Sequence, residues 1–231
     1  MSSIQLYMAP GTCARVTCIA LEEAGQDFET ILIRFMKGEH KSPDFKRLNP
    51  KGKVPTLVVD GTPLTENVAI LSYLHEEFPD ARLLPGVTES YERLQQLADL
   101  SFCASTLHPI VTRIRMPQFF ATEDCARSVW EKGCESMNEY FGLVNNRLGN
   151  GPWWYGEQWS VVDAYLYWIF WRCAGANYDV EPFAHFKDHA TRMEARPATR
   201  RALEREAALQ AQLESEGLVF KPPSFGVGAS Q

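Results

Sequence analysis

The sequence has no long apolar run and no recognisable export signal. The segment that comes nearest to a membrane span, AYLYWIFW at 164–171, is bounded by Asp163 and Arg172. It is much shorter than the roughly 18 apolar residues that a helix needs to cross a bilayer, so we expect a buried helix there and no membrane association. The first residues, MSSIQLYMAP, carry no charged stretch followed by an apolar core, which favours a cytoplasmic protein without a secretory leader.

Paired cysteines and clusters of positive charge are also missing. The six cysteines stand at 13, 18, 103, 125, 134 and 173, and none forms a CxxC pair, which counts against zinc-knuckle and dithiol redox sites. We expect free thiols, most of them buried as apolar filling, and no metal. The formal net charge is -6 with both signs interspersed, so nucleic acid is not an expected partner.

The sequence does contain alternating strand and helix patterns over its first 80 residues. Apolar periodicity and turn residues predict strands over 4–9 and 28–35, a hairpin over 53–66 that turns at Asp60-Gly61, and helices over 15–25, 42–50 and 67–78. The order is βαβαββα. With 45% hydrophobic residues in a chain of 231, a sizeable core is expected.

From the connector FPDARLLPG (78–86) onward, every segment is typical of helix. The clearest apolar stripe has members four and three residues apart: Trp130, Cys134, Met137, Phe141, Val144 and Leu148. SVVD (160–163) predicts a capping box in which Ser160 and Asp163 begin a helix over 161–173. We therefore divide the chain into a first domain (1–80), a linker (81–89), an all-helical domain (90–218) and a loosely ordered tail (219–231).

Four segments in this order resemble the cytosolic glutathione S-transferase superfamily over nearly the full length. They are NPKGKVPTL (49–57), LTENVAILSYL (64–74), SVVDAYLYW (160–168) and ARPATRRALERE (195–206). YMAPGTCA (7–14) is most similar to the bacterial beta class, while RVTCIALEEAG (15–25) is similar to the zeta and theta classes. The resemblance implies an α/β, thioredoxin-like domain that binds glutathione, an all-α domain that carries an electrophile pocket, and a homodimer.

The resemblance implies that Val54-Pro55 binds the cysteine of glutathione. A cis bond before Pro55 is expected, with Val54 pairing through its main chain as in strand addition. Lys53 and Lys37 are two candidates for the glycyl carboxylate. For each of them, a solvated surface lysine is the alternative.

Glu66 and Asn67 are the residues expected to bind the γ-glutamyl group. Glu66 would pair with the ammonium, and the helix that begins at residue 67 would receive the carboxylate at its N–H groups. The family commonly has serine where this sequence has Asn67. Simple capping of the helix by Asn67 is an alternative that is compatible with binding.

Cys13 is the preferred nucleophile, because it stands at the expected start of the first helix, where a thiol pKa is lowered. It could form a mixed disulfide with glutathione. The hydroxyl groups of Thr12 and Tyr7 remain alternatives for contact with the glutathione sulfur. Cys18, more than a turn further along the helix, is expected in the core.

The helical domain supplies the remaining expected site residues. His108 resembles a histidine that faces the sulfur in the beta class, and Ser101 lies on the same helical face; a simply packed histidine is equally open. Phe102, Ile114 and Met116 are expected to line an apolar electrophile pocket.

The function implied is transfer of the glutathione thiol to a hydrophobic electrophile. The alternatives are a glutathione-dependent thiol–disulfide oxidoreductase acting through Cys13, and a specialised dehalogenase, etherase or isomerase. A non-catalytic binding module on the same fold is a further alternative. The intact set of Lys53, Val54, Pro55 and Glu66 counts against this last reading.

Overall fold

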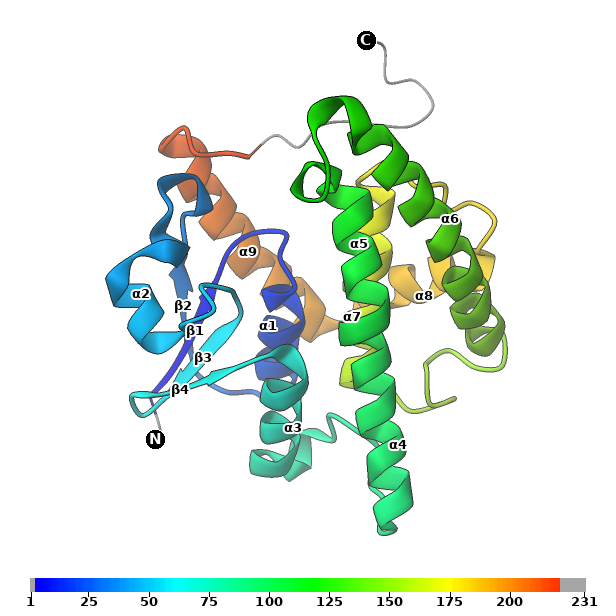
Figure 1. Ribbon diagram of the computed structural model, residues 1–231. Coiled ribbons are helices and arrows are strands. Elements are labelled where there is room, and N and C mark those ends of the chain that lie inside the picture. Colours follow the sequence, from blue (N-terminus) through cyan, green and yellow to red (C-terminus); the bar gives the residue numbers. More distant parts are fainter. Residues whose placement is uncertain (1–2, 221–231) are drawn as a thin grey trace. The chain divides into compact units, whose positions relative to one another are not determined.

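The computed structural model describes residues 3–220, which form two units (Figure 1). Unit 1 comprises the residues up to Leu83 together with Ala195–Phe220, and unit 2 comprises Leu84–Glu194. Most of the expected tail, 221–231, lies outside the described residues. No helix within residues 3–220 is long and apolar enough to cross a membrane.

Unit 1 contains a four-stranded mixed sheet in the order β2-β1-β3-β4. Its elements in chain order are β1 (Ile4–Met8), α1 (Ala14–Glu23), β2 (Glu29–Leu32), α2 (Pro43–Leu48), β3 (Thr56–Val59), β4 (Thr62–Thr65) and α3 (Asn67–Glu77). Strand β1 runs parallel to β2 and antiparallel to β3, so that Leu6 stands opposite Thr30 and Leu57. The βαβαββα order and the thioredoxin-like fold are thereby confirmed.

The β3–β4 hairpin turns as predicted. Asp60 and Gly61 have φ values of 48° and 81°, and two left-handed residues in succession match the twist of a two-residue hairpin. By contrast, β2 ends at Leu32, short of the expected 35. Its partner strand β1 ends at Met8, whose carbonyl accepts from the Ile33 N–H at 2.8 Å. The chain then turns into a short 3-10 helix, Phe35–Lys37.

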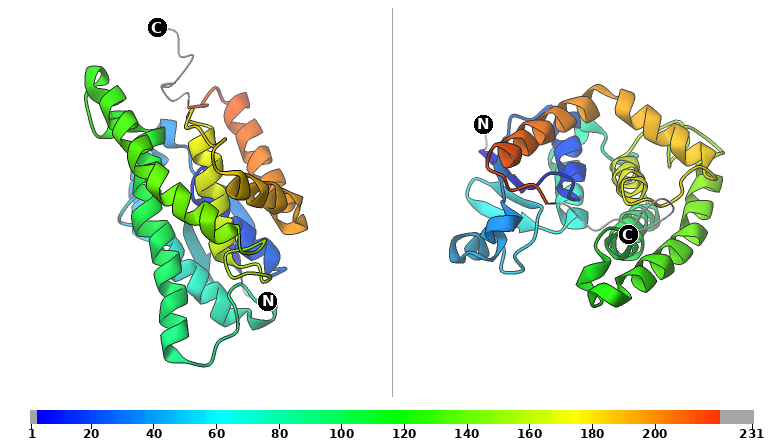
Figure 2. Two further views of the ribbon diagram at one scale, coloured as in Figure 1. Left: turned by 90° about the vertical axis from the view of Figure 1, so that its right-hand side faces the viewer. Right: turned by 90° about the horizontal axis from the view of Figure 1, so that it is seen from above.

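Helix α9 (Pro197–Ser215) packs against α1, although almost two hundred residues separate them (Figures 1 and 2). Glu22 of α1 accepts hydrogen bonds from Arg201 at 2.6 Å and from Arg205 at 2.5 Å. The guanidinium of Arg205 also lies 4.1 Å from the ring centre of Phe28. These contacts place α9 in unit 1, whereas the order of segments along the chain had suggested the helical domain (90–218).

Unit 2 is all-helical, as expected. It comprises α4 (Ser90–Ser101), a π-helical segment (Phe102–Leu107), α5 (His108–Arg115), α6 (Glu123–Leu148), α7 (Val161–Ala174) and α8 (Ala184–Ala195). Four members of the predicted α6 stripe are buried, namely Met137, Phe141, Val144 and Leu148, while Trp130 and Cys134 are half-buried. The Phe141 ring packs against Phe170 of α7 and Phe186 of α8, with ring centres 6.2 and 4.9 Å away.

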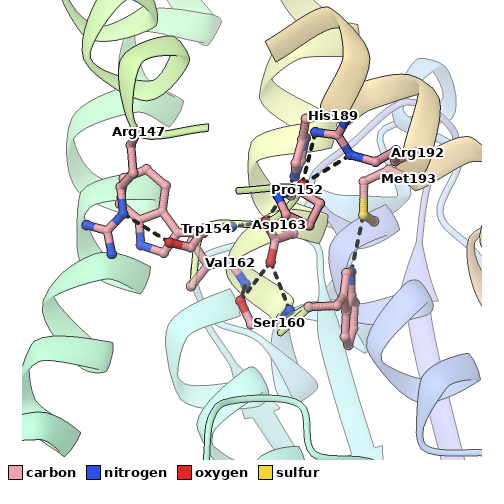
Figure 3. Close-up of polar contacts among 10 residues, drawn as sticks. Arg147, Pro152, Trp154, Ser160, Val162, Asp163, His189, Arg192 and Met193 are labelled. Atoms are coloured by element: carbon pink, nitrogen blue, oxygen red, sulfur yellow. Dashed lines mark hydrogen bonds and ion pairs between the residues drawn. The ribbon is translucent and has the colours of Figure 1, made fainter. Parts of the chain in front are cut away.

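The predicted capping box begins α7 (Figure 3). The Ser160 hydroxyl accepts from the Val162 N–H at 3.2 Å, and Asp163 Oδ2 accepts from the Ser160 N–H at 2.8 Å. Asp163 Oδ1 accepts in addition from the Trp154 N–H at 2.7 Å and pairs with His189 Nε2 at 3.0 Å. The fully buried Asp163 carboxylate therefore connects the start of α7 to α8 and to Trp154, in the loop that precedes α7.

Candidate functional site

The segment before β3 presents its main chain at Val54. The Val54-Pro55 peptide bond is cis, as predicted. Asn49, which is buried, donates from Nδ2 to the Lys53 carbonyl at 2.7 Å and to Thr56 Oγ1 at 3.1 Å. Among residues 3–220, no hydrogen bond occupies the Val54 N–H. An extended peptide could therefore pair with it.

Gly52 supports the same segment. Its φ is +63°, and a Cβ atom at this position would lie 2.6 Å from the carbonyl oxygen of His40. Both the backbone angle and the close approach therefore require glycine. Gly52 and Asn49 were not predicted as site residues, although both stand in the NPKGKVPTL segment that resembles the family.

Cys13 lies beside Val54. It is the residue that precedes α1, and its thiol donates to the Val54 carbonyl with Sγ 3.6 Å from the oxygen. The Arg15 and Val16 N–H groups of the first turn donate to the Thr12 and Cys13 carbonyls at 3.1 Å, and the positive end of the helix dipole favours negative charge beside Cys13. The structure thus brings together a candidate nucleophile and a candidate peptide-binding edge that are 41 residues apart.

Thr12 and Tyr7, the two alternatives to Cys13, are engaged elsewhere. The Thr12 hydroxyl donates to the Ala9 carbonyl at 2.6 Å. Tyr7 alternates along β1 with the buried Leu6 and Met8, and its ring packs on Phe45 of α2 with centres 5.8 Å apart. This geometry favours Cys13.

Glu66 begins α3 with a strained backbone. Its φ of 73° and ψ of 123° are unusual for a residue with a side chain and carry a conformational cost. The Glu66 carboxylate is two-thirds exposed and lies 2.6 Å from Lys51 Nζ. It is accessible to an ammonium group, as its expected role requires.

Asn67 does not cap α3, so the capping alternative was wrong. Glu66 occupies the N-cap position, and Asn67 is the first helical residue. The buried Asn67 side chain donates to the Cys13 carbonyl at 3.0 Å and accepts from the Thr17 hydroxyl at 2.8 Å. Because this side chain holds the backbone of Cys13, any contact with a γ-glutamyl carboxylate would fall to the main-chain N–H groups of the first turn of α3.

The two candidate lysines differ in their surroundings. Lys37 Nζ lies 3.0 Å from Glu216 Oε2, and Arg34 binds the same carboxylate at 2.8 and 2.7 Å. Hydrogen bonds from Arg34 and Lys37 lower the pKa of Glu216 to about 2. Lys53 is exposed and forms no ion pair with another residue in the range 3–220. Lys53 is therefore the better candidate for a substrate carboxylate.

His108 and Ser101 belong to unit 2. His108 Nδ1 lies 3.0 Å from the Tyr165 hydroxyl, and its ring packs edge-on against Trp168 with centres 4.5 Å apart. This is the packed arrangement that the sequence left open. Ser101 is half-buried, and its carbonyl accepts from the Ser105 hydroxyl at 2.6 Å. Roles for both residues near the sulfur stay predictions.

The three residues expected in the electrophile pocket also lie in unit 2. Phe102 packs against Tyr140 and Trp154, with ring centres 5.9 and 6.3 Å away. Ile114 is buried where α5 meets α6, so its side chain belongs to the core of this unit. Met116 is half-buried. The lining role of all three stays a prediction.

Comparison with known proteins shows the family to which the chain belongs. The chain matches the glutathione S-transferase N-terminal domain over residues 2–76 and the C-terminal domain over 103–197. It is 32% identical to the glutathione S-transferase GstA of Escherichia coli O157:H7 over 88% of this chain and 98% of the relative. The chain belongs to the glutathione S-transferase family.

Two further relatives of this glutathione S-transferase bear on its chemistry. One is the disulfide-bond oxidoreductase YfcG of Escherichia coli K12, 29% identical over 92% of this chain and 98% of the relative. The other is a sphingomonad glutathione S-transferase solved in complex with glutathione. It has a TM-score of 0.77, and it is 32% identical over 88% of this chain and 98% of that one.

The cysteines of this glutathione S-transferase differ sharply in environment. Burial raises the pKa of Cys18 and of Cys134 to about 12. Burial likewise raises the pKa of Cys103 and Cys173. These four thiols stay protonated near neutral pH and are poor nucleophiles. No group of three or more His, Cys, Asp or Glu side chains that could hold a metal ion occurs in residues 3–220.

Proposed function

We propose that this protein is a glutathione transferase that binds glutathione at unit 1 and transfers its thiol to a hydrophobic electrophile. The observation that carries the proposal is the segment before β3, where the cis Val54-Pro55 bond leaves the Val54 N–H open to an extended peptide. The cysteine unit of glutathione would pair with the main chain of Val54, whose N–H is without a partner in the described residues. Its sulfur would then lie beside Cys13 at the start of α1.

The two ends of glutathione would bind charged groups of unit 1. The exposed Glu66 carboxylate suits the γ-glutamyl ammonium, and the first turn of α3 suits the adjacent carboxylate. Lys53 suits the glycyl carboxylate as a point charge. Each group of the tripeptide thereby meets a complementary group of unit 1.

A glutathione-dependent thiol–disulfide oxidoreductase is the second candidate, and the half-buried Cys13 favours it. The relative named as a disulfide-bond oxidoreductase supports this reading. In this reaction the Cys13 thiolate attacks one sulfur of a disulfide, and the other sulfur leaves as a thiolate.

Calorimetric titration with glutathione tests the binding site. We expect saturable binding to the wild type, and a loss of about tenfold in affinity for Lys53→Ala, because a charge-assisted contact is worth about 1.5 kcal/mol or more. Lys37→Ala is the matched control, since its ammonium group is already paired with Glu216, and it should change affinity much less. Absence of binding by the wild type at about 10 mM glutathione would favour a non-catalytic module.

We propose a homodimer on the evidence of α4. Tyr91, Leu94 and Leu97 recur every three residues along this helix and are 75%, 62% and 43% exposed. A second copy of the chain would cover this apolar face. Sedimentation should give twice the chain mass of 26.2 kDa, and Leu94→Glu should give the single-chain mass. A wild-type mass near that of one chain would contradict the dimer.

A further inference from the structure

A buried carboxylate on α9 reaches the loop that precedes Cys13. Glu206 Oε1 accepts from the Gly11 N–H at 2.8 Å and from Arg15 at 2.6 Å, while Oε2 accepts from the Arg15 Nε at 2.9 Å. The side chains of Arg15 and Glu206 are only 3% and 9% exposed. Burial of this kind makes each of these hydrogen bonds costly to lose.

These contacts lie on both sides of the candidate nucleophile. Gly11 stands two residues before Cys13, and Arg15 stands two residues after it. Gly11 has a φ of 74°, so the loop makes a sharp turn there that glycine readily adopts. The Glu206 carboxylate therefore fixes the turn that leads into Cys13 and the first turn of the helix that follows.

Asn67 supports the same short segment from α3, through its hydrogen bond to the Cys13 carbonyl. Asn67 of α3 thus holds the backbone of Cys13, and Glu206 of α9 holds the residues on either side of it. Asn67 and Glu206 follow Cys13 in the sequence by 54 and about 190 residues. The thiol hydrogen bond to the Val54 carbonyl, at 3.6 Å, depends on the backbone position that these contacts maintain.

We propose that Glu206 is a positioning residue that holds Cys13 beside the main chain of Val54 that would pair with glutathione (the Val54 edge). The inference rests on the proposed function for its catalytic meaning. In structural terms, Glu206 of α9 sets the distance between the Cys13 thiol and the main chain of Val54, which would bind glutathione. Glu206 itself does not touch the reacting sulfur atoms.

Glu22 provides a matched control on the same pair of helices. It is 8% exposed and pairs with Arg201 and Arg205 of α9. Removal of Glu22 therefore also deletes a buried carboxylate between α1 and α9. Its hydrogen bonds, however, do not involve Gly11, Arg15 or Cys13.

The experiment compares two reagents at Cys13 in wild type, Glu206→Ala and Glu22→Ala, with the modified peptide followed by mass spectrometry. Oxidised glutathione needs the Val54 edge: the Cys13 thiolate attacks one of its sulfurs, a Cys13–glutathione disulfide forms, and one glutathione leaves as thiolate. Iodoacetamide alkylates the Cys13 thiolate and does not need to bind at the Val54 edge. We expect Glu206→Ala to slow the first reaction about tenfold and the second less than about twofold, because a small misplacement impairs only the oriented reaction.

Glu22→Ala should leave the ratio of the two rates at the wild-type value. The inference would be overturned if Glu206→Ala left the ratio of the two rates unchanged, as it would if both reactions slowed equally. The same selective loss in Glu22→Ala would also overturn it. If Glu206→Ala does not fold, Glu206→Gln takes its place, and a smaller selective loss is expected because the amide oxygen still accepts from Gly11.

Amide hydrogen exchange separates this inference from the proposed function. In Glu206→Ala, exchange at the peptide that contains Gly11 should accelerate, while Glu22→Ala should leave it unchanged. If wild-type Cys13 does not react with oxidised glutathione but exchange accelerates selectively, the exchange reaction proposed for Cys13 fails and the positioning role stands. If exchange at this loop is unchanged, the positioning role fails whatever the enzyme does.

Discussion

Asp163→Ala is expected to lower the free energy of unfolding by about 3–5 kcal/mol. The carboxylate accepts four hydrogen bonds: from the Ser160 N–H and hydroxyl, the Trp154 N–H and His189. The Asp163 side chain and its His189 partner are fully buried, so alanine leaves donors without acceptors in a place that water does not reach. Each such donor costs about 1–3 kcal/mol. Urea denaturation followed by tryptophan fluorescence measures the loss.

Asp188→Ala is the matched control for this prediction. Asp188 lies next to His189 on α8, but its side chain is exposed. We expect a change within about 0.5 kcal/mol, as is usual for surface substitutions. Asp163→Asn should fall between the two variants because one side-chain oxygen is kept. A loss below about 1 kcal/mol for Asp163→Ala would show that the capping box contributes no more than an ordinary helix cap.

The capping box shows what kind of feature can be predicted from sequence. Ser160 and Asp163 are three residues apart, and the turn of a helix determines how they meet. The Asp60-Gly61 hairpin is equally local, because two adjacent residues suffice for the turn. His189, by contrast, lies 26 residues beyond Asp163. No periodicity identifies such a partner.

The candidate site mixes predictable and unpredictable parts in the same way. Val54-Pro55 and Cys13 could be identified because short motifs resemble the family. The roles of Asn67 and Glu206 could not, since each depends on contacts with residues far away in sequence. The sequence likewise predicts α9 as part of the helical domain (90–218). The structure places it in unit 1 because of ion pairs with α1, which join residues about 180 positions apart.

Cys13→Ala is expected to reduce glutathione-dependent disulfide reduction at least about 100-fold, the effect of removing a nucleophile. Conjugation of glutathione to an electrophile should persist or rise, because the Val54 edge and Glu66 remain. The two activities are measured separately, with a model disulfide and a chromogenic aryl halide at pH 8. Opposite responses would show that Cys13 carries the exchange reaction and that the tripeptide site is independent of it.

Cys18→Ala is the control that makes this result specific to Cys13. Cys18 lies on the same helix, is fully buried, and has its pKa raised to about 12 by that burial, so it supplies almost no thiolate at pH 8. Its replacement should leave both activities near wild type after correction for folded protein. If Cys13→Ala retained disulfide reduction, the nucleophile would not be Cys13. The chemistry would then have to come from the thiol of glutathione itself, with Thr12 next to be tested because its hydroxyl lies in the same turn.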